Sequence, residues 1–112
     1  MPPNPEKRQH RRFHFLEPVS VFPVLPSKSG NIFEVQPQAL QAQARDISEG
    51  GVKLHLDRPL GPGSLLKLTF EVLQEEEVEV FGKIIWTDRE HCGIRFMLAD
   101  PVLRKGVRAL AS

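Results

Sequence analysis

Apolar and polar residues alternate with a period of two along much of the chain, which is the pattern of half-buried β-strands. Apolar residues occupy the even positions of residues 52–56 and 66–72. Residues 78–86 form a third apolar-rich segment, separated from the second by a predicted turn over residues 73–76, and residues 93–97 form a shorter one. The pattern therefore predicts a series of short strands joined by turns.

The N-terminal half is less regular. Within residues 13–25 the apolar positions change from odd to even near Pro18 or Pro23, and proline cannot donate to a strand ladder. We therefore predict an edge strand with a bulge here. After a turn rich in serine and glycine, residues 32–35 and 39–47 are predicted to form an extended hairpin arm.

A helix is predicted at the C-terminus. Asp100 and Pro101 are the residue types of a helix N-cap and of the first helical position. Leu103, Val107 and Leu110 then fall on one face. Several strands followed by one helix describe a small antiparallel β-barrel or sandwich with a helical lid.

Length and composition place these elements in one folded unit. The chain has 112 residues, of which 40% are hydrophobic and 26% charged, as is usual for a single globular domain. Residues 1–6 are expected to be a flexible leader and residues 7–112 the domain. No apolar run is long enough for a membrane span or a signal core. With Cys92 as the single cysteine, these features predict a cytoplasmic protein in a reducing compartment.

Charge is segregated along the chain although the net charge is only +1. Residues 7–12 are rich in lysine and arginine, whereas residues 71–79 contain glutamate and no basic residue. Proteins that bind long nucleic acid usually carry an excess of basic residues over the whole domain. The balance therefore favours a small anionic ligand over long nucleic acid.

Catalytic and metal sites are not expected. The four histidines are scattered, without the paired spacing of a zinc site, and the chain has neither a phosphate-binding glycine loop nor a dinucleotide fingerprint. Cys92 precedes Gly93 at a strand start, where a small buried thiol is more common than a nucleophile. Trp86 follows two isoleucines and is expected in the core. We predict neither an enzyme nor a cofactor or metal.

Two segments remain as candidates for binding. In the first, Arg8 and Arg12 are separated by three residues, and a guanidinium matches phosphate oxygens or the O6 and N7 edge of guanine. The alternative is a solvated basic tail. In the second, Asp46 and Ser48 precede Gly51 between two strands, so the carboxylate could accept from guanine. The alternative is a turn whose side chains bind their own backbone.

Taken together, the two segments resemble the RxxxR and D/NxSxxG motifs of the PilZ domain, a family of bacterial cyclic diguanylate receptors. Arg8, Arg12, Asp46, Ser48 and Gly51 match these motifs in order. The resemblance implies a six-stranded antiparallel β-barrel with a C-terminal helix. It also implies that the two arginines bind phosphate and the guanine Hoogsteen edge, that the aspartate and serine contact guanine, and that the glycine leaves room for the ligand.

Three further residues are secondary candidates. The resemblance implies that Lys7 influences how many ligand molecules bind, and Arg11 adds charge beside the motif arginines. Arg95 could face the ligand, although an exposed arginine on an alternating strand is the more common case.

The function implied is that of an adaptor. Ligand binding would order the N-terminal arginine loop and change the surface offered to an effector protein. Two alternatives stay open: a small barrel that binds single-stranded nucleic acid, and a PilZ-like protein-interaction module that binds no nucleotide.

Overall fold

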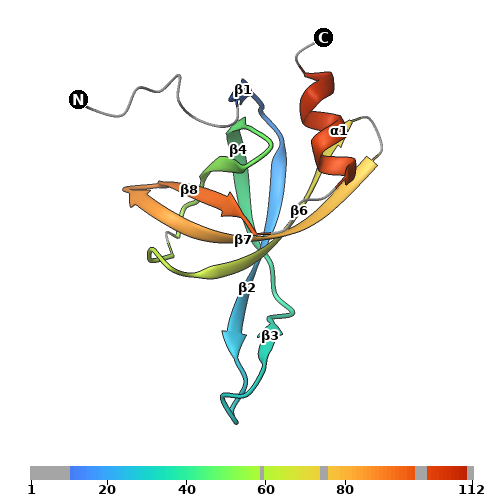
Figure 1. Cartoon of the computed structure of the whole chain (residues 1–112). Coiled ribbons are helices and arrows are strands. Elements are labelled where there is room, and N and C mark those ends of the chain that lie inside the picture. Colours follow the sequence, from blue (N-terminus) through green and yellow to red (C-terminus); the bar gives the residue numbers. More distant parts are fainter. Residues whose placement is uncertain (1–10, 59, 74–75, 98–100, 111–112) are drawn as a thin grey trace, which may run out of the picture.

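Six strands close into an antiparallel barrel in the computed structural model of the protein, which describes residues 11–58, 60–73, 76–97 and 101–110 (Figure 1). The elements are β1 (Phe13–His14), β2 (Pro18–Pro26), β3 (Phe33–Val35), β4 (Leu40–Ile47), β5 (Gly51–His55), β6 (Leu65–Leu73), β7 (Glu76–Asp88), β8 (His91–Phe96) and α1 (Pro101–Ala109). The strand order is β4, β5, β8, β7, β6, β2, and β2 pairs with β4 to close the barrel. The predicted barrel with a C-terminal helix is confirmed.

The edge strand predicted over residues 13–25 is two strands, of which β1 is a terminal strand of the sheet. For β2 the prediction was wrong, because β2 is paired on both sides within the barrel wall. β2 pairs with β6 on one side, and on the other side it changes partner from β4 to β3. Pro23 lies at this change, and its carbonyl oxygen accepts from the amide of Gln36 at 2.8 Å. The N–H and the carbonyl of one strand residue point to the same side. The N–H that Pro23 lacks would therefore point to the side where β2 changes partner and the ladder is already interrupted.

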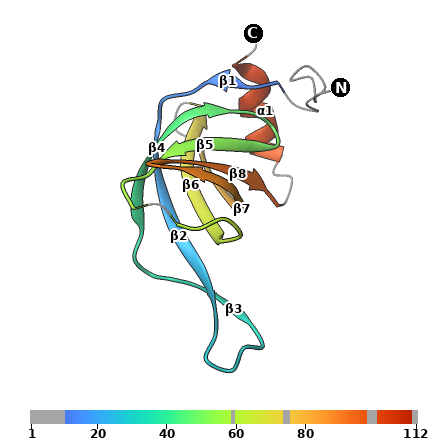
Figure 2. The ribbon, with the colours of Figure 1, turned by 90° about the vertical axis from the view of Figure 1, so that its left-hand side faces the viewer.

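The hairpin arm exists, but it joins different strands from those predicted. β3 pairs with β2, through a turn over residues 27–32, and does not pair with β4. Two views show the β2–β3 arm extending away from the barrel, at the opposite end of the molecule from β1 (Figures 1 and 2). In the sheet order, β1 and β3 are the two terminal strands.

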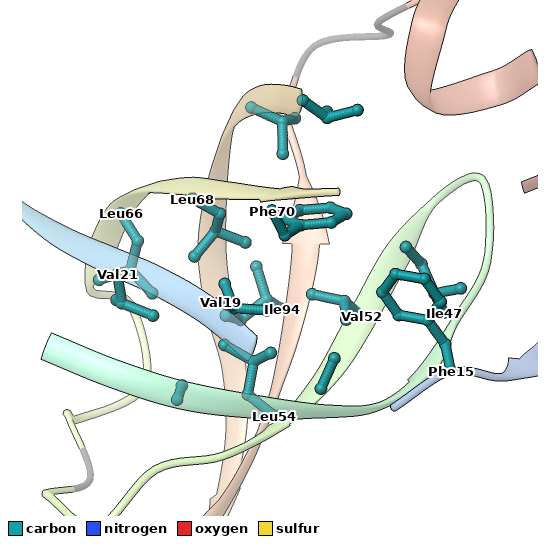
Figure 3. Close-up of a cluster of buried hydrophobic side chains, with 14 of the residues drawn as sticks. Phe15, Val19, Val21, Ile47, Val52, Leu54, Leu66, Leu68, Phe70 and Ile94 are labelled. Atoms are coloured by element: carbon teal, nitrogen blue, oxygen red, sulfur yellow. The ribbon is translucent and has the colours of Figure 1, made fainter. Parts of the chain in front are cut away.

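Apolar side chains from all six barrel strands fill the interior (Figure 3). The predicted alternation is visible in β6, where Leu66, Leu68 and Phe70 are buried. Phe15 meets Phe70 edge to face, with ring centroids 6.0 Å apart. Burial of large side chains of this kind contributes about 1.5 to 3 kcal/mol each to folding.

The helix α1 packs against β6 and β7 through the buried side chains of Leu103 and Val107. This matches the predicted apolar face, whereas Leu110 is exposed. The expected N-cap, Asp100, lies outside the described residues. Within the described ranges, no helix is long and apolar enough to cross a membrane.

Cys92 is buried in the barrel wall, and this burial raises the pKa of its thiol from 9.0 to about 11. We expect native protein to react with a thiol reagent at pH 8 far more slowly than urea-unfolded protein, because the thiolate is the reactive form. Because the folded pKa is the higher one, this group's contribution to stability is complete below pH 9 and is lost as the pH rises towards about 11. Equal reaction rates in the native and unfolded states would contradict the burial of this thiol.

Candidate functional site

The short strand β1 places Arg12 beside Asp46 of β4. Phe13 pairs with Ile47 and His14 with Asp46, so the residue before β1 lies beside the end of β4. There, Arg12 donates from Nε to Oδ1 of Asp46 at 2.5 Å and forms an ion pair with the same carboxylate through its terminal nitrogen. Both side chains are half-buried. Two residues that are 34 positions apart in the sequence therefore form one charged pair.

A bulge in β4 turns Asp46 out of the barrel. Ala44 pairs with Leu54 and Asp46 pairs with Lys53, so Arg45 is an extra residue in the ladder. Strict alternation would place Asp46 on the same face as the buried Ala44. Because of the extra residue, the carboxylate lies on the outer face beside the Lys53 position.

A second bulge in β7 does the same for Trp86. Ile84 pairs with Ile94 and Trp86 pairs with Gly93, so Ile85 is the extra residue. Alternation alone would put Trp86 inside with Ile84, but its side chain is 39% exposed. The prediction that Trp86 belongs to the core was therefore wrong.

The two bulges align one row of residues across four strands. Asp46 on β4 is opposite Lys53 on β5, which is opposite Gly93 on β8, which is opposite Trp86 on β7. Gly93 has no side chain, and a Cβ there would lie 2.1 Å from Nε1 of Trp86. The indole ring therefore lies directly over the Gly93 backbone.

A pocket of about 390 Å³ lies over this row. It is lined by the four residues of the row together with Arg12, Ile85 and Ile94. The lining combines two cationic groups, one carboxylate and the exposed indole. Such a set can bind an anion, accept hydrogen bonds from a heterocycle and stack against a flat ring.

The turn after β4 is held by Ser48, which is only 3% exposed. Its hydroxyl oxygen accepts from the amides of Gly50 and Gly51, both at 3.1 Å, and the hydroxyl lies 3.4 Å from the Gly51 carbonyl oxygen that it can donate to. The Ser48 side chain therefore binds the backbone of its own turn, which was the alternative to a ligand contact left open by the sequence. At the tip of the turn, Glu49 forms an ion pair with Arg108 of α1 at 3.0 Å.

Gly51 allows two strands to approach closely. A Cβ at this position would lie 2.2 Å from the carbonyl oxygen of Ile94 on β8. Gly30 and Gly63 are the glycines with positive φ in the described part of the chain, so a left-handed backbone is not the reason for glycine at position 51. The missing side chain of Gly51 is required by the neighbouring strand.

The remaining predicted residues lie outside the pocket or outside the described ranges. Arg11 is exposed, with its guanidinium 5.4 Å from the centroid of the Phe13 ring. Arg95 is exposed on β8 and does not line the pocket. Lys7 and Arg8 fall within residues 1–10, which the structure does not describe.

Sequence reasoning missed Lys53 and misplaced Trp86. The only signal for Lys53 was its polar position in an alternating strand, which every solvent-facing residue shares. In the described part of the chain, no group of three or more histidine, cysteine, aspartate or glutamate residues could hold a metal ion.

The fold and the pocket define a small closed β-barrel that carries a charged pocket on its outer face. The PilZ domain family matches residues 6–111, and the chain therefore belongs to this family. No curated protein matches the sequence.

Two solved structures have the same fold. The PilZ domain of CeSA from a cellulose-synthesizing bacterium is 20% identical, with a TM-score of 0.58, over 89% of this chain and 93% of that one. The PilZ domain of YcgR from Escherichia coli, solved with c-di-GMP (cyclic diguanylate), is 13% identical, with a TM-score of 0.62, over 91% and 86% of the two chains.

Replacing Gly93 by alanine is expected to displace the indole of Trp86 while the barrel stays folded. The added methyl group would collide with the ring, whose side chain can rotate away from the strand. Because Trp86 is the only tryptophan, a shift in the emission maximum reports this movement directly. Gly61→Ala is the matched control, since nothing lies within 4 Å of a Cβ at that position. An unchanged spectrum in Gly93→Ala would contradict the contact.

Proposed function

We propose that this chain is a receptor for cyclic diguanylate and acts as an adaptor, without catalysing a reaction. The observation that carries the proposal is the Arg12–Asp46 pair at a pocket that also contains Lys53 and Trp86. Membership of the PilZ family supports the same ligand. A cyclic dinucleotide offers two phosphates and two guanines, which are the chemical groups that this lining suits.

The phosphates would be bound by the basic residues. The guanidinium of Arg12 offers a planar set of donors, and Lys53 contributes a second positive charge across the pocket. We propose Arg8 as the other arginine of the RxxxR motif, acting from the segment that precedes Arg12. The order of the motif supports this role.

The guanine would be bound by Asp46 and Trp86. The Asp46 carboxylate accepts hydrogen bonds only, and guanine N1 and N2 are donors. The exposed indole offers a flat surface on which a base can stack. Ser48 and Gly51 would support this contact by holding the turn and the strand spacing, because the Ser48 hydroxyl is already bonded within the turn.

In the free protein, Asp46 is bonded to Arg12. A bound nucleotide would compete for both side chains, since its phosphates attract the arginine and its base needs the carboxylate. We propose that this exchange moves the N-terminal segment over the ligand and changes the surface available to an effector protein. The Glu49–Arg108 ion pair offers a route from the same turn to α1.

Isothermal titration with cyclic diguanylate at about 150 mM salt tests the proposal, because this ionic strength screens nonspecific attraction between exposed charges. We expect saturable binding that is lost in Arg8→Ala and Arg12→Ala, with weaker or no binding of GMP and cyclic GMP. The titration also gives the number of ligand molecules bound.

Two outcomes would contradict the proposal. Absence of heat and of a Trp86 fluorescence change, up to about 100 μM ligand, would leave a protein-interaction module as the function. Binding that increases with the length of a single-stranded oligonucleotide and falls steeply with salt would instead indicate a nucleic-acid-binding barrel.

A further inference from the structure

An apolar groove lies where the β2–β3 arm meets the barrel. The arm itself extends from the end of the molecule opposite β1 (Figures 1 and 2). It has a volume of about 370 Å³. Val24, Phe33 and Val35 of the arm line one side, and β6, β7 and Met97 provide the other. Phe33 is 62% exposed, so a large aromatic side chain remains in contact with water. Exposed apolar surface of this kind marks interaction sites.

The groove borders an open strand edge. β3 is the last strand in the sheet order of the described chain. On its inner side, Ile32 accepts from the amide of Ser27 at 2.7 Å, and Gln36 donates to Pro23 at 2.8 Å. Because backbone groups alternate in direction along an antiparallel strand, the amides and carbonyls of Phe33 and Val35 point to the open edge. The edge can therefore accept another strand, and the apolar side chains of that added strand would extend the groove.

Glu34 indicates which charge a strand added at the open edge of β3 would carry. It lies between Phe33 and Val35 and thus on the opposite face of β3, and it forms no ion pair with another residue in the described ranges. One explanation for a charged residue in a short edge strand is that it prevents self-association. That explanation does not account for the two apolar side chains that Glu34 separates, which line a groove. A residue paired with Glu34 is best a lysine or arginine, because opposite charges stabilise a cross-strand pair.

We propose that the β3 edge and its groove bind an extended segment of a partner protein, in which a basic residue lies between two apolar residues. The apolar residues extend the groove beside Phe33 and Val35, and the basic residue pairs with Glu34. A second copy of this chain fits less well, because the two-fold register that pairs all three residues of β3 would place Glu34 opposite itself. The inference goes beyond the proposed nucleotide receptor and does not depend on it.

Amide NMR shifts of the full chain, titrated with short synthetic peptides, test this proposal without any nucleotide. The probe peptide carries Val-Lys-Val between threonine residues, and its matched version carries Val-Glu-Val. We expect saturable shifts confined to β3, Phe81 and Met97, with about threefold tighter binding of the lysine peptide. In Glu34→Lys the preference between the two peptides is expected to reverse.

Phe33→Ser is expected to weaken peptide binding about tenfold, because it removes the exposed aromatic side chain of the groove. Leu25→Ser is the matched control: Leu25 is 50% exposed on the same arm, but it pairs with Glu34 and lies on the opposite face. Absence of saturable shifts at millimolar peptide, or a preference that ignores residue 34, would overturn the proposal. Dimerisation in sedimentation, lost in Phe33→Ser, would also overturn it and assign the groove to a second copy.

Discussion

Asp46→Ala is expected to weaken cyclic diguanylate binding by about 2 to 5 kcal/mol, which is a loss of at least about 30-fold in affinity. The carboxylate is the one acceptor among the charged residues of the pocket, so its removal leaves the guanine donors unpaired. It also removes the hydrogen bond and ion pair that hold Arg12 at the pocket. Isothermal titration of the variant measures this loss.

Two controls make this experiment specific. Arg11→Ala removes a neighbouring charge that lies against Phe13 and does not line the pocket, so we expect an affinity within about threefold of the wild type. Asp46→Asn keeps an acceptor oxygen and matches the alternative residue of the D/NxSxxG motif, so it should retain more binding than alanine. Wild-type affinity in Asp46→Ala would remove this residue from the proposed site.

The variant should stay folded, which keeps the result interpretable. The Arg12–Asp46 pair is half-buried at the surface, and pairs of this kind contribute about 1 kcal/mol or less to stability. A urea unfolding curve close to that of the wild type is therefore expected for Asp46→Ala. A loss of binding then reports on the pocket and not on the barrel.

Gly51→Ala is expected to destabilise the barrel by about 3 kcal/mol. The new methyl group would lie 2.2 Å from the carbonyl oxygen of Ile94, and the neighbouring atom is backbone, which cannot rotate away. β5 and β8 would have to separate, which disturbs the bond from the Phe96 amide to the Gly50 carbonyl at 2.9 Å. Urea unfolding followed by Trp86 fluorescence measures the change in the free energy of unfolding.

The matched control is Gly61→Ala, which adds the same methyl group where nothing lies within 4 Å. A change within about 0.5 kcal/mol is expected there. The comparison separates two roles for the motif glycine. If Gly51→Ala were as stable as the wild type but failed to bind, the glycine would be required for ligand access and the strand contact would be unimportant.

The two proposals assign the nucleotide and the peptide to different parts of one barrel. The pocket is lined by Arg12 and by residues of β4, β5, β7 and β8. The groove is lined by the arm, by β6, by Phe81 of β7 and by Met97. Variants at Phe33 should therefore leave nucleotide binding unchanged, and variants at Asp46 should leave peptide binding unchanged. Testing each surface separately shows which proposal fails if one does.

The sequence by itself determined a series of short strands with a terminal helix and the two motif segments, and the resemblance that these motifs carry implied the barrel. The alternation of apolar residues in β5 and β6 depends only on local chain geometry, since successive side chains of a strand point to opposite faces. The helix was predictable for the same reason, because Leu103 and Val107 are one turn apart. The motif residues were recognisable because their order along the chain is itself the signal.

Only the tertiary structure decided which side chains meet at the pocket. A bulge changes the face of every residue that follows it, and nothing in the residue types marks Arg45 or Ile85 as the extra residue of its ladder. Asp46 and Trp86 reach the outer face through these shifts in register, and there they join Lys53 in the row. The partner change of β2 at Pro23 likewise depends on strands far away in the sequence. The local pattern determines that side chains alternate between two faces of each strand. Long-range pairing determines which residues of that alternation face the barrel interior.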